Sequence, residues 1–88
     1  MTPSRPHRSA AHNATYSAAA ERHIKAYHRQ LASASSALVK RNNYREQNEI
    51  MFAEIWNGVY NDATRAANEE MSASLYFTDL ARKTGEQV

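Results

Sequence analysis

The segment from Ile50 to Ala63 is the densest run of large apolar side chains in this 88-residue chain. Placed at about 100° per residue, as in an α-helix, its large side chains cover roughly half of the helix circumference. They are Met51, Phe52, Ile55, Trp56, Val59 and Tyr60. Such an arc is wider than the stripe that one helix–helix contact needs, so we expect this helix to touch more than one neighbour.

Small side chains dominate the rest of the composition. Sixteen of the 88 residues are Ala, whereas Ile, Leu, Val and Phe together number 12. Ala, Glu, Gln, Arg and Lys favour helix, but a chain this short buries only about 60% of its unfolded surface. We therefore expect one all-α domain over residues 10–84 that completes its core by oligomerisation or by binding a partner.

Two long helices are predicted. Residues 9–40 contain neither Gly nor Pro, which indicates a helix over about residues 10–40, capped by Ser9 or Asn13. The sequence KRNNY at 40–44 predicts a break, and a second helix follows over about residues 44–83 and ends before Gly85. The short connection favours an antiparallel hairpin. The first helix has one narrow apolar stripe, which consists of Tyr16, Ala20, Ile24, Tyr27, Leu31, Ala34 and Leu38.

Gly58 is the anomaly in the second helix. Glycine inside a helix costs about 1 kcal/mol relative to Ala, so this position marks a close crossing, a kink or a break. Beyond it the apolar pattern weakens and then resumes, and Ser72 is a candidate start for a short third helix. The sequence leaves these alternatives open.

The tripeptide Trp56-Asn57-Gly58 matches the Trp-x-Gly tripeptide of small helical-hairpin proteins that bacteria export through specialised secretion systems. The chain is also similar to them in length and helical composition, and the resemblance implies a turn at Gly58. The chain departs from the family pattern, however, because no acidic residue follows Tyr60 or Tyr76 by four positions. The tripeptide also lies inside the apolar arc, which predicts helix there, so we do not assign the chain to this family.

Residues 1–9 are predicted to form a disordered basic tail because two prolines interrupt a segment without apolar periodicity. No run of residues is apolar enough to cross a membrane, and the start of the chain lacks the apolar core of a secretory signal. An organelle transit segment is the less favoured alternative. We therefore expect a cytoplasmic protein, or a virion-internal one if the chain is viral.

Charge divides the chain into halves. Residues 1–45 carry eight Lys or Arg and one Glu, whereas residues 46–88 carry three basic and eight acidic residues. One interpretation is that a basic and an acidic helix lie against each other, within one hairpin or between subunits. The other is a nucleic-acid contact surface. Its candidate residues are Arg5, Arg8, Arg22, Lys25, Arg29, Lys40 and Arg41.

The sequence offers little for catalysis. Cysteine is absent, and no two of the four histidines stand four residues apart, the spacing that lets a helix chelate a metal. The two glycines cannot form a phosphate-binding loop. We therefore predict a non-enzyme without catalytic residues, metal, cofactor or small-molecule substrate.

The sequence as a whole predicts a long antiparallel helical hairpin, with or without a short third helix, that acts through protein–protein contacts as an accessory or structural subunit, an adaptor or a stoichiometric inhibitor. Its partner is itself or another protein. The expected interface comprises the six large side chains of the arc, Met51, Phe52, Ile55, Trp56, Val59 and Tyr60. The alternative function is nucleic-acid binding by the basic tail and first helix.

Overall fold

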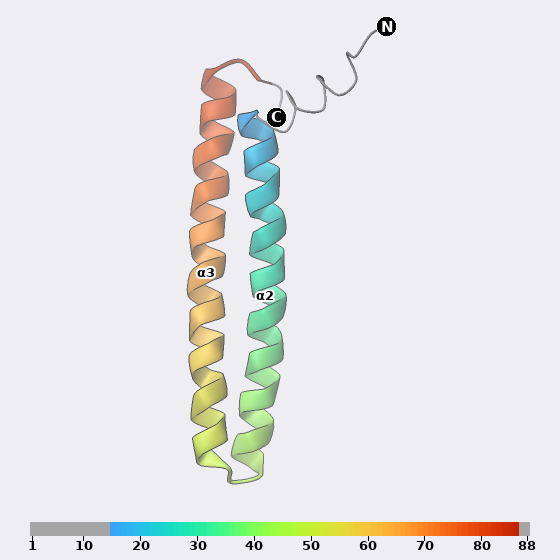
Figure 1. Ribbon diagram of the computed structural model, residues 1–88, viewed down its shortest axis with the longest axis vertical. Coiled ribbons are helices and arrows are strands. Elements are labelled where there is room, and N and C mark those ends of the chain that lie inside the picture. Colours follow the sequence, from blue (N-terminus) through green and yellow to red (C-terminus); the bar gives the residue numbers. More distant parts are fainter. Residues whose placement is uncertain (1–14, 87–88) are drawn as a thin grey trace, which may run out of the picture.

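The chain folds into two long antiparallel helices. A computed structural model describes residues 15–86, which comprise α2 (Tyr16–Glu46) and α3 (Ile50–Lys83). The two helices lie side by side and are joined by a short turn at residues 47–49 (Figure 1). The predicted all-α helical hairpin is therefore confirmed. The predicted tail, the helix start at residue 10 and the caps Ser9 and Asn13 lie outside the described residues.

The turn between the helices depends on Asn48, which has a φ of 63°. Its amide donates a hydrogen bond to the carbonyl of Arg45, and the amide of Glu49 donates to that of Tyr44. These two bonds satisfy the last carbonyls of α2, and Asn is among the few residues other than Gly that tolerate positive φ. The break therefore lies three residues beyond the segment predicted from KRNNY, and Asn42 and Asn43 belong to α2.

Gly85 ends α3 in the same way, as predicted. Its φ is 80°, its amide donates to the carbonyl of Arg82, and the amide of Glu86 donates to that of Ala81. Between Ile50 and this stop, α3 is one helix. Gly58 lies inside it, so neither the break considered there nor the turn implied by the Trp-x-Gly resemblance is present. Ser72 also lies within α3, and the considered third helix is not a separate element of residues 15–86.

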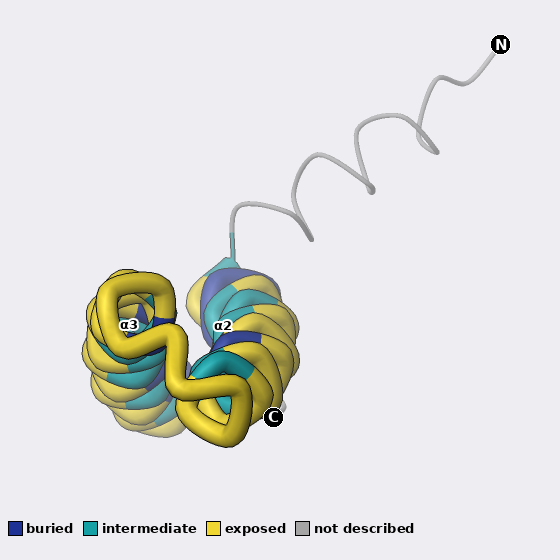
Figure 2. Tube along the Cα trace, turned by 90° about the horizontal axis from the view of Figure 1, so that it is seen from below, coloured by how far each residue is buried: buried dark blue, intermediate teal, exposed yellow. Residues whose placement is uncertain are grey.

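The contact between the helices is built from alanine. Within residues 15–86 every buried side chain belongs to Ala, apart from that of Ser74. In the end-on view the buried positions of α3 lie on the side that faces α2 (Figure 2), whereas the three consecutive buried residues Ala18, Ala19 and Ala20 spread around the start of α2. Buried and half-buried residues recur every three or four positions, the spacing of a coiled-coil seam. These seam residues are His23, Tyr27, Gln30, Ala34, Ala37, Arg41 and Tyr44 in α2, and Ala53, Trp56, Tyr60, Ala63, Ala67, Glu70, Ser74, Phe77 and Ala81 in α3.

The stripe predicted for the first helix only partly coincides with this seam. Ala20 is buried as the stripe predicts, and Tyr27 and Ala34 are shared, but Ala37 is buried where the stripe placed Leu38, and Leu31 is exposed. Small side chains at the seam let two helix backbones approach closely. The large side chains of the seam, such as Trp56 and Phe77, are therefore only half-buried, and others lie beside the seam.

We expect Ala37→Leu to lower the free energy of unfolding by about 1–3 kcal/mol, because the extra volume overpacks a close helix contact. Ala32→Leu is the matched control, since Ala32 is an exposed residue of the same helix. Urea unfolding followed by circular dichroism measures both. Equal stabilities of the two variants would show that Ala37 does not lie in a tight seam.

A carboxylate from the end of the chain holds the open end of the hairpin together. The Glu86 carboxylate accepts hydrogen bonds from the backbone amides of Ser17 (3.0 Å) and Tyr16 (3.2 Å), and the Thr15 hydroxyl accepts one from Ala18. The first amides of a helix have no partner within it and carry partial positive charge. They stabilise the ionised carboxyl group, and the Ser17 amide has the largest effect in lowering the pKa of Glu86 below its usual 4.5.

Because the folded state lowers this pKa, Glu86 stabilises the hairpin above about pH 4.5, and the contribution is lost as the pH falls through the lowered value. We expect Glu86→Gln to lower the thermal unfolding midpoint at pH 6 and to have a smaller effect at pH 3. Glu54→Gln is the control, because Glu54 is exposed on α3. The same loss at both pH values would show that ionised Glu86 does not cap α2.

Candidate interaction surface

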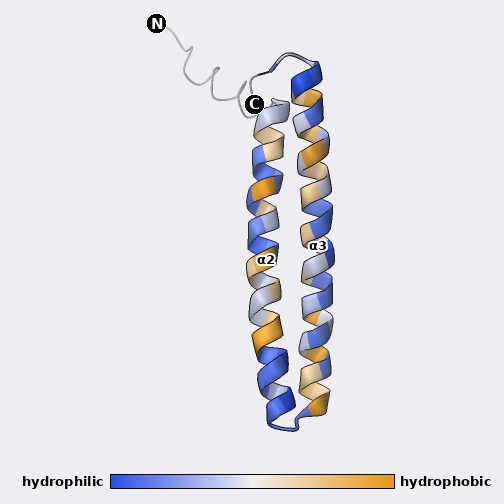
Figure 3. Cartoon of the chain, turned by 180° about the vertical axis from the view of Figure 1, so that it is seen from behind, coloured by the Kyte–Doolittle hydropathy of each residue, from blue (hydrophilic) through white to orange (hydrophobic). Residues whose placement is uncertain are grey.

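Most of the predicted interface is on the outside of the hairpin. Met51, Ile55, Phe52 and Val59 are 74%, 54%, 48% and 39% exposed, respectively, and neighbouring Ile50 is exposed as well. Phe52, Ile55 and Val59 each precede a seam residue, so they lie on the flank of the contact between the helices rather than within it. Figure 3 shows apolar positions recurring along the outward surfaces of both helices. The structure therefore leaves much of the strongest apolar segment exposed, although the Phe52 ring contacts that of Tyr44 in α2, with 5.4 Å between the centroids.

The other two predicted residues, Trp56 and Tyr60, belong to the seam. Lys40 places its ammonium group 4.3 Å from the centre of the Trp56 ring, and the Arg41 guanidinium lies 5.9 Å from that of Tyr60. Arg41 also donates a 2.9 Å hydrogen bond to the side chain of Asn57. Each cation interacts with the electron-rich face of a ring. These contacts fasten α2 to α3, so this part of the predicted interface lies within the hairpin.

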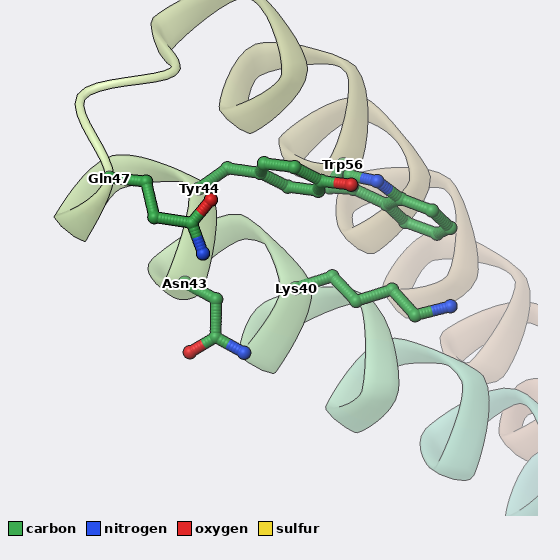
Figure 4. Close-up of a pocket in the computed structure, with 5 residues that line it drawn as sticks. All are labelled: Lys40, Asn43, Tyr44, Gln47 and Trp56. Carbon is green, nitrogen blue, oxygen red and sulfur yellow. The ribbon is translucent and has the colours of Figure 1, made fainter.

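A shallow pocket opens beside these residues, close to the turn. It has a volume of about 350 Å³ and is lined by Lys40, Asn43, Tyr44, Gln47 and Trp56. In Figure 4 the Tyr44 and Trp56 rings form one wall, and the Lys40, Asn43 and Gln47 side chains form the other. No hydrogen-bond partner for the Asn43 or Gln47 carboxamide lies within residues 15–86. The pocket thus offers aromatic surface and free polar groups to a side chain that enters it.

A longer apolar row on α3 adds to this surface. Every residue that immediately precedes a seam residue of α3 lies on the same side of that helix. Most of these are apolar, with two acidic interruptions near the middle: Phe52, Ile55, Val59, Asp62, Ala66, Glu69, Ala73, Tyr76 and Leu80. We call this set the α3 row. The prediction found only its first three members. The seven-residue spacing of Phe52, Val59, Ala66, Ala73 and Leu80 was the signal for the rest.

The candidate nucleic-acid residues fall into three groups. Arg5 and Arg8 lie outside the described residues. The side chains of Arg22, Lys25 and Arg29 are exposed on α2, whereas Arg41 is half-buried and Lys40 packs on Trp56. Two of the predicted contacts therefore have a role within the hairpin.

A histidine–carboxylate contact also links the helices toward the other end of the seam. The His23 Nδ1 atom lies 3.1 Å from a Glu70 carboxylate oxygen, and its ring stacks on Phe77 with 5.5 Å between centroids. Arg65 pairs with Asp62 and Lys83 with Asp79 inside α3. Among residues 15–86, no three His, Asp or Glu side chains are placed to hold a metal ion. Neither helix is long and apolar enough to cross a membrane.

Comparison of the chain with models of protein families, with curated proteins and with solved structures gives no match.

Substitution of a seam residue and substitution of a neighbouring surface residue should have different effects on the free energy of unfolding. We expect Trp56→Ala to lower the free energy of unfolding by about 2 kcal/mol, because it removes half-buried apolar surface and the partner of Lys40. Ile55→Ala, one residue away but exposed, should change it by less than about 0.5 kcal/mol. Denaturation at protein concentrations where the chain has the mass of one copy measures both. The reverse order would contradict the seam.

Proposed function

We propose that this protein works through protein–protein contacts as a non-enzymatic accessory subunit, adaptor or stoichiometric inhibitor, and that the first half of the α3 row forms its contact surface. One observation supports this proposal above the others. The residues that the hairpin buries are Ala and Ser74, while Phe52, Ile55 and Val59 face outward next to one another. Exposed apolar side chains that form a group, rather than scattered single ones, are typical of interaction surfaces.

Energetics support the same proposal. Burying a Val, Ile or Phe side chain stabilises a protein by about 1.5–3 kcal/mol, and small domains have stabilities of only about 5–15 kcal/mol. The hairpin buries mainly alanine, so its exposed Phe52, Ile55 and Val59 side chains do not contribute this free energy to its stability. A partner that covers the α3 row would supply it. Large apolar and aromatic side chains also provide much of the binding energy at protein interfaces.

Nucleic-acid binding remains an untested prediction. It would use the outer side of α2, where Arg22, Lys25 and Arg29 are exposed. We do not advance it as a second function, because Lys40 and Arg41 interact with the rings of Trp56 and Tyr60. Such binding would show an affinity for nucleic acid that falls steeply as the salt concentration rises.

Site-specific photo-crosslinking in cells that produce the protein tests the proposed contact. We expect a photoreactive amino acid at Ile55 to form a covalent adduct with a protein, because this exposed side chain lies at the centre of the apolar group. The same amino acid at Asn61, which is exposed on another side of α3, is the matched control and should give little adduct. Equal yields at the two positions, or none at either, would contradict the proposal. The mass of the adduct identifies the partner class.

A further inference from the structure

We infer that the partner is a second copy of this chain and that two hairpins stack face to face as a four-helix bundle, with α2 of one copy lying along α3 of the other. This inference rests on the proposed function, because it names the protein that covers the α3 row. Three features of one face of the hairpin carry it: a row of large side chains, a pocket at the same level, and opposite charges at its two edges.

The face is defined by the residues that immediately precede seam residues. In an antiparallel pair of right-handed helices, these residues lie on the same side of the pair in both helices. On α3 they form the α3 row. On α2 they form a row of small and basic side chains: Arg22, Ala26, Arg29, Ser33, Ser36, Lys40 and Asn43. We call the side that carries both rows the contact face.

A two-fold axis parallel to the long axis of the hairpin places each α2 row on the α3 row of the other copy. Near the middle of the bundle, small side chains of the α2 row then meet small side chains of the α3 row. The contacts of His23 with Phe77 and of Lys40 with Trp56 set which turns of α2 and α3 lie level. By that register Ala26 faces the part of α3 that carries Ala73. Ser33 faces the turn of Ala66, so the middle of the bundle can pack closely.

In the four-helix bundle, the pocket of one copy lies opposite large apolar side chains of the other copy. Lys40 and Asn43 belong to the α2 row, and they line the pocket together with Tyr44 and Trp56. These residues are level with the first turns of α3, which carry Phe52 and Ile55. The two-fold axis therefore brings the exposed Ile55 side chain of each copy over the pocket of the other, next to Phe52, whose ring contacts Tyr44 of its own copy. An apolar side chain that enters it would contact the Tyr44 and Trp56 rings (Figure 4).

The contact face carries a basic residue at one edge and an acidic residue at the other, so two copies of this face can form ion pairs with each other. Arg29 lies at the α2 edge and Glu69 lies at the α3 edge, about level with each other but on opposite outer flanks of the hairpin. Both are exposed, and neither has an opposite-charge partner among residues 15–86. The two-fold axis brings Arg29 of each copy beside Glu69 of the other, so the bundle contains this pair twice. The α2 helix as a whole has six basic and two acidic residues, and α3 has three basic and five acidic residues.

Charge exchange tests the pairing. We expect Arg29→Glu alone and Glu69→Arg alone to raise the dissociation constant of the dimer by at least about tenfold, and the double variant to recover to within about threefold of the original. Sedimentation equilibrium measures the constants, and circular dichroism at matched concentration monitors the helices. Lys25→Glu, an equal charge change on the outermost side of α2, should leave the constant nearly unchanged. Loss without recovery in the double variant would overturn the pairing.

A distance between labels tests the direction of stacking. The chain has no Cys, so Glu46→Cys provides one site for a nitroxide label, at the turn end of α2 and away from the contact face. With the turns at the same end, we expect a distance between the two labels of about 20–35 Å, set by the spacing of neighbouring helices. Turns at opposite ends would give about 45 Å or more, the length of α2.

The outcomes separate this inference from the proposed function. A dimer with the short label distance and recovery in the double variant supports both. A chain with the mass of one copy at every concentration overturns the inference. The proposed function then still holds if Ile55 crosslinks to a different protein. A dimer with the long distance overturns the stacking described here. If Ile55 forms no adduct with any protein, both the inference and the proposed function fail.

Discussion

The close approach of two helices through alanine is the constraint on which the rest of this structure depends. Ala37, Ala53, Ala67 and Ala81 are all buried in the seam. A methyl group contributes little apolar area, so each contact stabilises the hairpin only modestly. The same small size leaves the large side chains of the seam, such as Trp56 and Phe77, only half-buried, and it directs others to the flanks. The seam therefore determines both how the hairpin forms and which residues remain available for contacts outside it.

The two ends of the hairpin compensate for this modest core by different means. At the turn end, the amides of Asn48 and Glu49 donate to the carbonyls of Arg45 and Tyr44 in α2, and Lys40 and Arg41 pack on aromatic rings of α3. At the open end, the Glu86 carboxylate accepts hydrogen bonds from the first amides of α2, and His23 lies between Glu70 and Phe77. Specific polar and aromatic contacts thus fix the register of helices whose alanine seam could slide with little cost. A fixed register is also what places the pocket level with Phe52 and Ile55.

The proposed bundle follows from the same division between seam and flank. A two-helix hairpin gives each helix one neighbour, yet α3 carries apolar residues on two adjacent sides, as expected from an arc half the circumference wide. One side meets α2, and the α3 row is free for a further helix. A second copy offers that helix with small side chains at the matching level and with basic residues opposite acidic ones. Homodimers with two-fold symmetry are the commonest oligomers, and such symmetry forms each contact twice.

The sequence by itself determined the two helices, their antiparallel order and the stop at Gly85, because these depend on local properties: Ala-rich composition, the absence of Gly and Pro, and the tolerance of Gly for positive φ. It also located the apolar segment at Met51, Phe52, Ile55 and Val59.

Only the tertiary structure decided that Asn48 rather than Asn42 or Asn43 makes the turn, since several Asn residues have the same local preference. It also decided that Trp56 and Tyr60 belong to the seam while Ile55 and Val59 face outward. Apolar periodicity marks a broad face of a helix, but which part of that face is buried depends on how closely the backbones approach, and that distance is set by the alanines of both helices together.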